Sequence, residues 1–118
     1  YNANPSSMTA SLNVLGANHG RKVAVIGEMR ELGEKSAALH QGLNDAIARN
    51  HIDLVFCVGA ETKPLYDILP DTIKGGFFES ASEVITTLQS RLEDGDVVLI
   101  KGSNSMKMNV IMEKLMRQ

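Results

Sequence analysis

The sequence predicts an α/β domain with three layers, a Rossmann-like arrangement and a mostly parallel sheet, in the order αβαβαβαβα. Two observations carry this prediction. Nearly continuous apolar runs at residues 22–27, 52–59 and 96–102 are typical of strands that are covered on both faces. Segments with apolar residues at helical spacing separate these runs along the chain. A parallel sheet with helical crossovers explains both patterns.

Four short segments have strand character. They are "KVAVIG" at 22–27, "IDLVFCVG" at 52–59, "GGFFE" at 75–79 and "DVVLIKG" at 96–102. The sequence Asp94-Gly95-Asp96 predicts a turn immediately before the last strand.

Helices are predicted from apolar residues that recur three or four positions apart. Four such stripes occur: Met8, Leu12 and Leu15; Leu39, Leu43 and Ile47 within about 36–50; Val84, Ile85, Leu88 and Leu92; and Met108, Ile111, Met112 and Leu115. A shorter helix is expected at 63–69, with Pro64 tolerated in its first turn. Asn4-Pro5 reads as an N-cap followed by proline at the first helical position, and residues 80–83 (Ser-Ala-Ser-Glu) predict a capping box.

Composition limits the classes of function that are open to the chain. The 118 residues suit one domain, and a net charge of −2 with 4% aromatic residues disfavours binding to nucleic acid. No apolar stretch reaches the length of a membrane span. The single cysteine, Cys57, lies in an apolar run and is expected to be an inert buried thiol. A reducing, cytoplasmic setting is therefore expected, with no insertion into a membrane.

The loops that follow the strands are the expected ligand edge of the domain, because parallel strands present their carboxyl ends together. In "KGSNSM", Lys101, Gly102 and Ser103 precede a predicted helix, which suits an anion. The alternative is that Gly102 only makes a turn and that a serine only caps the helix. In "GEMRELGE", Glu28 suits a ribose hydroxyl or a cation, or it belongs to a salt-bridged loop with Arg30.

Other chemistry-bearing residues give little signal. Neither G-x-x-x-x-G-K-[ST] nor G-x-G-x-x-G occurs, so a nucleotide hydrolase or dinucleotide enzyme working alone is not predicted. His40 stands alone beside an apolar stripe and is expected to be a boundary residue rather than a metal ligand. The methionines at 8, 106, 108, 112 and 116 are expected to fill the core. No catalytic residue and no metal ligand are predicted in this chain.

Three segments together resemble the C-terminal domain of the Mur ligases. They are "YNANPSSM" at 1–8, "VIGEMRELGEKSAALH" at 25–40 and "VVLIKGSNSMKM" at 97–108. The resemblance spans essentially the whole chain and is greatest to the branch that adds a dipeptide. It implies an ATP-dependent ligase that joins D-alanyl-D-alanine to UDP-N-acetylmuramoyl-tripeptide in peptidoglycan synthesis. ATP and Mg²⁺ would then be bound mainly by a central P-loop ATPase domain, and residues 1–118 would be the lid of a three-domain enzyme.

The resemblance also assigns roles to residues. Asn2 and Asn4 match the family's segment at the adenine and ribose, and Glu28 matches a further nucleotide-binding position where the family often has Asp. Lys101, Gly102 and Ser103 match the loop that faces the phosphate and the dipeptide. Asn104 stands where many relatives carry Arg. His40 matches a recurrent histidine, for which a structural role in anchoring the loop at 27–34 is expected.

Two other functions remain open from the sequence. The chain would be a receiver-like or nucleotide-sensing module if it were complete, or a small enzyme that works alone at the strand ends. An upstream G-x-x-G-K-[ST] segment in the reading frame would favour the ligase. On the ligase hypothesis the chain begins at the cut edge of a larger protein and is inactive by itself.

Overall fold

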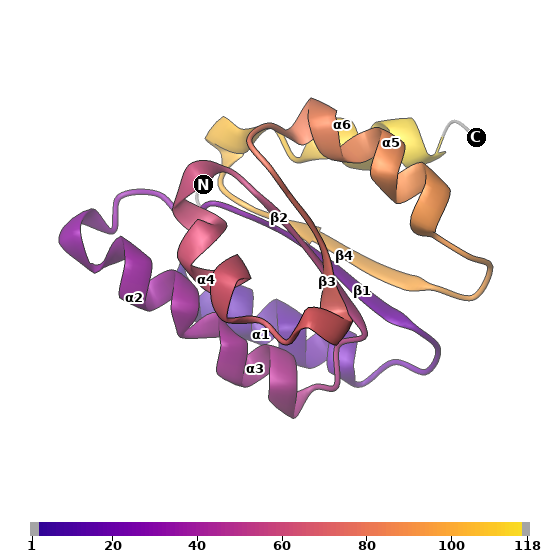
Figure 1. Ribbon diagram of the computed structural model, residues 1–118, viewed down its shortest axis with the longest axis horizontal. Coiled ribbons are helices and arrows are strands. Elements are labelled where there is room, and N and C mark those ends of the chain that lie inside the picture. The colour runs from indigo at the N-terminus through magenta and orange to yellow at the C-terminus, as the bar shows by residue number, and fades with distance from the viewer. Residues whose placement is uncertain (1–2, 117–118) are drawn as a thin grey trace.

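The computed structural model describes residues 3–116 as a four-stranded sheet between two layers of helices (Figure 1). The strands are β1 (Lys22–Gly27), β2 (Leu54–Val58), β3 (Lys74–Phe78) and β4 (Val97–Lys101). The α-helices are α1 (Pro5–Gly16), α2 (Ser36–Gln41), α3 (Leu43–Arg49), α4 (Lys63–Ile68), α5 (Ala81–Arg91) and α6 (Asn109–Met116). Short 3₁₀ turns are η1 (Gly33–Lys35), η2 (Ala60–Thr62), η3 (Asp71–Ile73) and η4 (Asn104–Met106).

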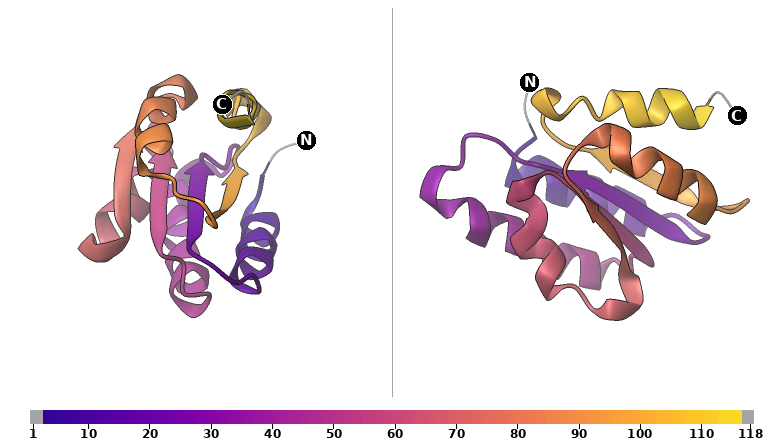
Figure 2. Two further views of the ribbon diagram at one scale, coloured as in Figure 1. Left: turned by 90° about the vertical axis from the view of Figure 1, so that its right-hand side faces the viewer. Right: turned by 45° about the horizontal axis from the view of Figure 1, so that its top comes forward.

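The sheet is parallel at every pairing, in the order β3-β2-β1-β4. Strand residues alternate between two hydrophobic cores, as in Ala24 and Ile26 of β1 on one face and Val23 and Val25 on the other. Helices α1, α3 and α4 cover the first face, and α5 and α6 cover the second (Figure 2). The predicted three-layer α/β fold is confirmed. No helix in the described part of the chain is long and apolar enough to cross a membrane.

Two elements differ from the prediction. The helix expected at 36–50 is divided at Gly42, although this residue keeps helical dihedral angles (φ −59°, ψ −22°). The third strand begins at Lys74, and Gly75 is an extra residue in its pairing with β2. A Cβ at Gly75 would lie 2.7 Å from the ring of Phe56, so a side chain does not fit at this irregularity.

One predicted helix cap is confirmed and the other is wrong. Asn4 caps α1, because its Oδ1 accepts the Ser7 N–H at 2.9 Å while the Asn4 N–H donates to Ser7 Oγ at 3.1 Å. Ser80 makes no side-chain cap at α5, since its hydroxyl lies 3.2 Å from the Ser82 hydroxyl instead. A second hydroxyl two residues away therefore replaces the predicted capping box.

The predictions for the sulfur-containing residues are partly confirmed and partly wrong. Cys57 is buried as predicted, and loss of solvation raises the pKa of its thiol to about 12, which keeps it unreactive. Met8 and Met108 are buried in the core. Met112 and Met116 are 48% and 78% exposed, so the prediction that they fill the core is wrong.

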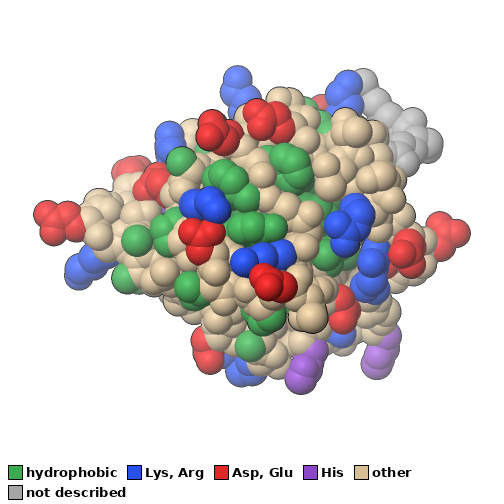
Figure 3. Space-filling view, viewed as in Figure 1, with side chains coloured by type: hydrophobic (Ala, Val, Ile, Leu, Met, Phe, Trp, Pro, Cys, Tyr) green, Lys and Arg blue, Asp and Glu red, His purple; other side chains and the backbone are tan. Residues whose placement is uncertain are grey.

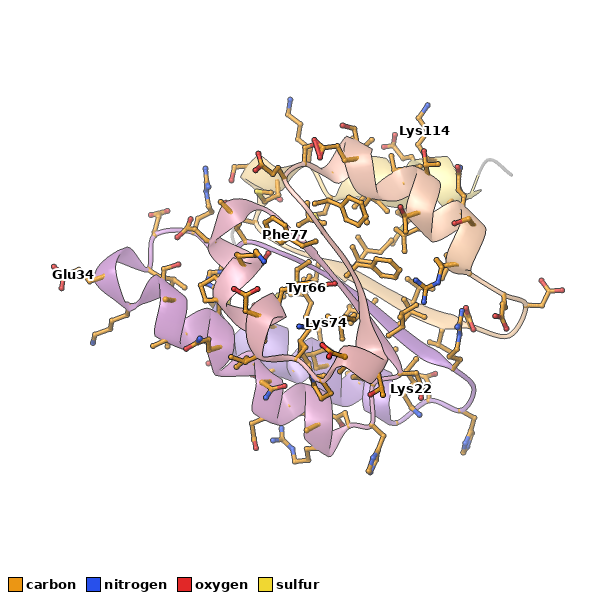
Figure 4. All side chains as sticks on the ribbon, in the orientation of Figure 1. Lys22, Glu34, Tyr66, Lys74, Phe77 and Lys114 are labelled. Carbon is orange, nitrogen blue, oxygen red and sulfur yellow. The ribbon has the colours of Figure 1, made fainter. Side chains whose placement is uncertain are left out.

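Aromatic and basic side chains of α4 and of the edge strand β3 lie close together. Lys74 Nζ lies 5.3 Å from the ring centre of Tyr66, and Lys63 Nζ lies 5.4 Å from that of Phe77 (Figure 4). On the face in Figure 3, hydrophobic side chains are interspersed with charged ones rather than joined in one patch. Charged side chains at a sheet edge oppose pairing with another chain.

A bidentate ion pair joins Arg21, the residue before β1, to the turn before β4. Arg21 Nε and Nη2 donate to the two carboxylate oxygens of Asp96 at 3.0 and 2.8 Å, and the Glu93 N–H donates to the same carboxylate. These donors, with Arg21 first, lower the pKa of Asp96 below its ordinary value.

We expect Asp96→Asn to destabilise the chain at neutral pH and to have little effect in acid. A carboxyl whose folded-state pKa is lowered stabilises above its ordinary pKa of about 3.9, and this stabilisation is lost as the pH falls through the folded-state value. Urea unfolding at pH 7 and at a pH well below 3.9 measures the difference, which should shrink as the pH falls from about 3.9 through the lowered folded-state pKa. Asp45→Asn is the control, since the Asp45–Arg49 pair is solvent-exposed and is expected to contribute within about 0.5 kcal/mol. A deficit for Asp96→Asn that is equal at both pH values would contradict this assignment.

Candidate functional site

The loops after β1 and β4 meet at the carboxyl edge of the sheet. The Ser103 N–H donates to the Glu28 carbonyl oxygen at 2.9 Å, which ties one loop to the other. The backbones also approach closely, because a Cβ on Gly102 would lie only 2.8 Å from the Gly27 Cα. The structure therefore brings together two of the three segments that the sequence singled out.

The third segment, before α1, borders the same edge. An open pocket of about 320 Å³ lies between the start of α1, the end of β4 and the start of α6. It is lined by Ala3, Ile100, Lys101, Gly102, Ser103, Asn104, Met108, Asn109 and Met112. Figure 2 shows the chain before α1 at the same end of the molecule as the loop that leads into α6. The pocket has a polar side, from the loop after β4, and an apolar side, from the methionines.

The predicted residues occupy this edge to different degrees. Lys101, Gly102 and Ser103 all line the pocket. Asn4 follows Ala3 and is exposed, but its side-chain oxygen is committed to the cap of α1. Its side-chain amide donates to no residue among 3–116. The prediction for Asn2 falls outside the described residues.

Glu28 is buried and does not line the pocket. Its carboxylate faces the loop after β2, where Oε2 accepts the Glu61 N–H at 2.9 Å and Oε1 accepts from Arg30 Nη1 at 2.5 Å. The sequence left two alternatives for Glu28, a ligand contact or a salt-bridged loop with Arg30, and these contacts form the salt-bridged loop. A contact between Glu28 and a nucleotide stays a prediction.

His40 is fully buried, so the expectation of a boundary position is wrong. Its Nε2 accepts the Met29 N–H at 3.0 Å, and its Nδ1 lies 2.8 Å from the Ser36 carbonyl oxygen. A carbonyl only accepts, so Nδ1 carries the proton and the ring is the neutral tautomer. The predicted structural role, anchoring the loop after β1, is confirmed.

Sequence reasoning missed several residues of the site. Asn109, Met108 and Met112 enter the pocket because α6 starts directly beside the loop after β4. Their signal in the sequence was the short distance from "KGS" to the last helix. Ser36, at the start of α2, and Glu61, in η2, are 25 residues apart, and no local pattern indicates the 2.6 Å hydrogen bond between their side chains.

The cation that this edge offers to a ligand is Lys101, which lines the pocket. Lys101 is half-buried, and no carboxylate in the described range pairs with it. Ser103 is buried, and its hydroxyl lies 2.9 Å from the Ser105 hydroxyl. Within residues 3–116 no three His, Cys, Asp or Glu side chains gather to hold a metal ion. The arrangement suits binding of an anionic group by Lys101.

Gly102 has a steric reason to be glycine, which gives a test of the loop geometry. Gly102→Ala would push a methyl group against the Gly27 backbone at 2.8 Å and Met108 Cγ at 3.0 Å. We expect a loss of about 1–3 kcal/mol in unfolding free energy, measured by urea denaturation. Gly33→Ala is the control, because no atom lies within 4 Å of a Cβ there, although its φ of +59° makes a smaller strain expected. A Gly102→Ala chain as stable as the parent would show that the two loops are not in contact.

The chain matches known proteins along its whole length. A family model described as Mur ligase, glutamate ligase domain, matches residues 1–104. The UDP-N-acetylmuramoyl-tripeptide–D-alanyl-D-alanine ligase of Rickettsia prowazekii is 40% identical over 114 residues, which are 96% of this chain and 25% of the relative. The ligase of the same name from Escherichia coli is 35% identical over 117 residues, covering 98% of this chain and 25% of the relative. The chain thus spans about a quarter of the length of these relatives.

Solved structures agree with the sequence matches. A crystal structure of MurF from Acinetobacter baumannii superimposes with a TM-score of 0.84 at 31% identity, covering 100% of this chain and 27% of that one. The MurF ligase of Thermotoga maritima, in complex with ADP, superimposes with a TM-score of 0.82 at 28% identity, covering 99% of this chain and 26% of that one.

Proposed function

The chain belongs to the Mur ligase family, and on that premise we propose that it is the closing domain of an ATP-dependent ligase. The ligase adds D-alanyl-D-alanine to UDP-N-acetylmuramoyl-tripeptide in peptidoglycan synthesis. Relatives that carry this name match nearly the whole chain, and a MurF structure that contains ADP has the same fold. In this proposal the uridine-nucleotide domain and the central P-loop ATPase domain lie in the remainder of the ligase.

The observation that carries the proposal is the shared edge at the carboxyl ends of β1 and β4. There Lys101, Gly102 and the entry to α1 border one open pocket. The Lys101 ammonium, which no carboxylate among residues 3–116 pairs with, suits a phosphate, and the apolar wall of Met108 and Met112 suits a less polar part of a ligand. Because the pocket is open to solvent, it would contact one side of a ligand, and another domain of the ligase would contact the other side.

In the proposed reaction this edge would stabilise charge and exclude water, and it would not supply a reacting group. ATP phosphorylates the carboxylate of the tripeptide, and the amine of the dipeptide then displaces phosphate from the acyl phosphate. Lys101 would stabilise the negative charge of the phosphoryl group, and closure of the domain would exclude water that hydrolyses the acyl phosphate. Asn4 and Ser103 would border the nucleotide and the phosphate end.

Mg²⁺ would be held by the central domain. The described residues bring no set of three candidate ligands together, and the Glu28 carboxylate already accepts from Arg30 and Glu61.

Comparing the isolated chain with the longer ligase tests the proposal. The chain alone should release no phosphate from ATP with both substrates present, and it should bind ADP only weakly, because it contributes one wall of the site. The ligase should turn over, and a version that lacks this domain should not. Phosphate release or tight nucleotide binding by the chain alone would instead support the module or the small enzyme.

A further inference from the structure

We propose that Glu28 is a positioning residue that joins the loops after β1, β2 and β4 into one rigid rim and so holds Lys101–Ser103 in place for the ligands. The inference rests on the function proposed above for the loop after β4. It differs from the nucleotide contact expected for Glu28, because Glu28 would act through other residues. The contacts of its peptide group, its carboxylate and its neighbours carry the inference.

A single peptide group connects His40 to the loop after β4. The Glu28 carbonyl and the Met29 N–H belong to the same peptide plane. The Met29 N–H donates to His40 Nε2 at 3.0 Å, and the Glu28 carbonyl accepts the Ser103 N–H at 2.9 Å. Hydrogen bonds at both ends polarise a peptide group and strengthen each other. The position of Ser103 is thus linked to a buried histidine on α2.

The Glu28 side chain fixes the same residue to the loop after β2. Its two oxygens are used by Arg30 Nη1 at 2.5 Å and by the Glu61 N–H at 2.9 Å. Gly59 makes room for it, because a Cβ at that residue would lie 2.5 Å from Glu28 Cγ. A buried carboxylate with this arrangement orders the rim rather than contacting a ligand.

Ser36 links Glu61 to His40 and so connects the two ends of this hydrogen-bond network. Its hydroxyl donates to Glu61 Oε1 at 2.6 Å, and its carbonyl accepts from His40 Nδ1 at 2.8 Å. The path therefore runs from the β2 loop through α2 to the β1 loop and on to Ser103. Because each residue of this network is hydrogen-bonded to another, removing the Glu28 carboxylate should weaken the hydrogen bond of the Ser103 N–H.

Amide hydrogen exchange on the chain itself tests this link without any activity. In Glu28→Ala, exchange at the Glu61 amide should accelerate about tenfold or more, because its acceptor is lost, and the Ser103 amide should follow. Glu28→Gln keeps an oxygen for Glu61 and should restore much of the protection. It also serves if the alanine variant does not fold. Glu34→Gln, an exposed carboxylate on the same loop (Figure 4), should change neither amide. An unchanged Ser103 amide in both Glu28 variants would overturn the proposal.

Kinetics of the longer ligase then separate positioning from ligand binding. Glu28→Ala should lower kcat about tenfold with the KM for ATP changed less than about threefold, and Glu28→Gln should recover part of kcat. A raised KM for ATP at unchanged kcat would make Glu28 a nucleotide ligand and overturn the proposal, as would a faster Ser103 amide with unchanged kcat. A separate variant tests the proposed function. If a Lys101→Ala ligase with Glu28 intact keeps full activity, the proposed function is wrong, whatever the Glu28 variants show.

Discussion

Lys101→Ala in the longer ligase is expected to lower kcat about 100-fold, with the KM for ATP changed far less. Lys101 lines the pocket at the end of β4 with no carboxylate partner in the described part of the chain, so its charge is available to a phosphoryl group. A contact formed only when the domain closes stabilises the transition state more than the first complex with ATP. Steady-state kinetics with ATP and tripeptide varied in turn measure the two constants.

A matched lysine on the same half of the molecule is the control. Lys114 lies on the exposed side of α6 (Figure 4), and Lys114→Ala should leave kcat within about twofold, because surface substitutions outside a site have small effects. Equal losses for the two variants would point to a general effect of charge. A Lys101→Ala enzyme with normal kcat would remove the phosphate-facing role.

Phe56→Ala is expected to cost about 3–5 kcal/mol in unfolding free energy, the largest effect on stability predicted for the chain. Phe56 is fully buried in the core between the sheet and the α5–α6 layer, and its ring fills the space left by Gly75 on β3. Removing the ring leaves a cavity where the sheet pairing is already irregular. Urea denaturation measures the loss, and Phe56→Leu, which fills more of the space, should lose less.

Val14 provides the comparison for that substitution. It is 68% exposed, so Val14→Ala should change the unfolding free energy by no more than about 0.5 kcal/mol. A loss below about 1 kcal/mol for Phe56→Ala would mean that the ring is not packed as the structure describes.

The strands were predictable because burial on both faces leaves a continuous apolar run, as at 22–27, where the predicted and observed limits of β1 agree. The division of the second long helix at Gly42 was not, since helical spacing continues through it. Met112 and Met116 follow the inward-facing Ile111 and Leu115 by one residue, and a turn of about 100° per residue brings them to solvent.

The part of the site that follows from the order and direction of the strands was predictable. Once the strands are parallel, Gly27 and Gly102 must end at the same edge, and the sequence placed Lys101–Ser103 there. The direction of the Glu28 side chain and the burial of His40 depend on partners 33 and 11 residues away. Such tertiary hydrogen bonds have no local pattern, and for this reason a ligand role for Glu28 was as reasonable as a structural one.

Hydrogen exchange in the longer ligase shows directly whether the carboxyl edge of this sheet closes over the ligands. With a non-hydrolysable ATP analogue and the tripeptide substrate bound, we predict new protection at residues 100–104 and at the start of α1. Residues 17–21 and 93–96, at the amino ends of β1 and β4, should exchange as before. Protection at the amino ends alone, or no change at residues 100–104, would show that this edge does not close over the ligands.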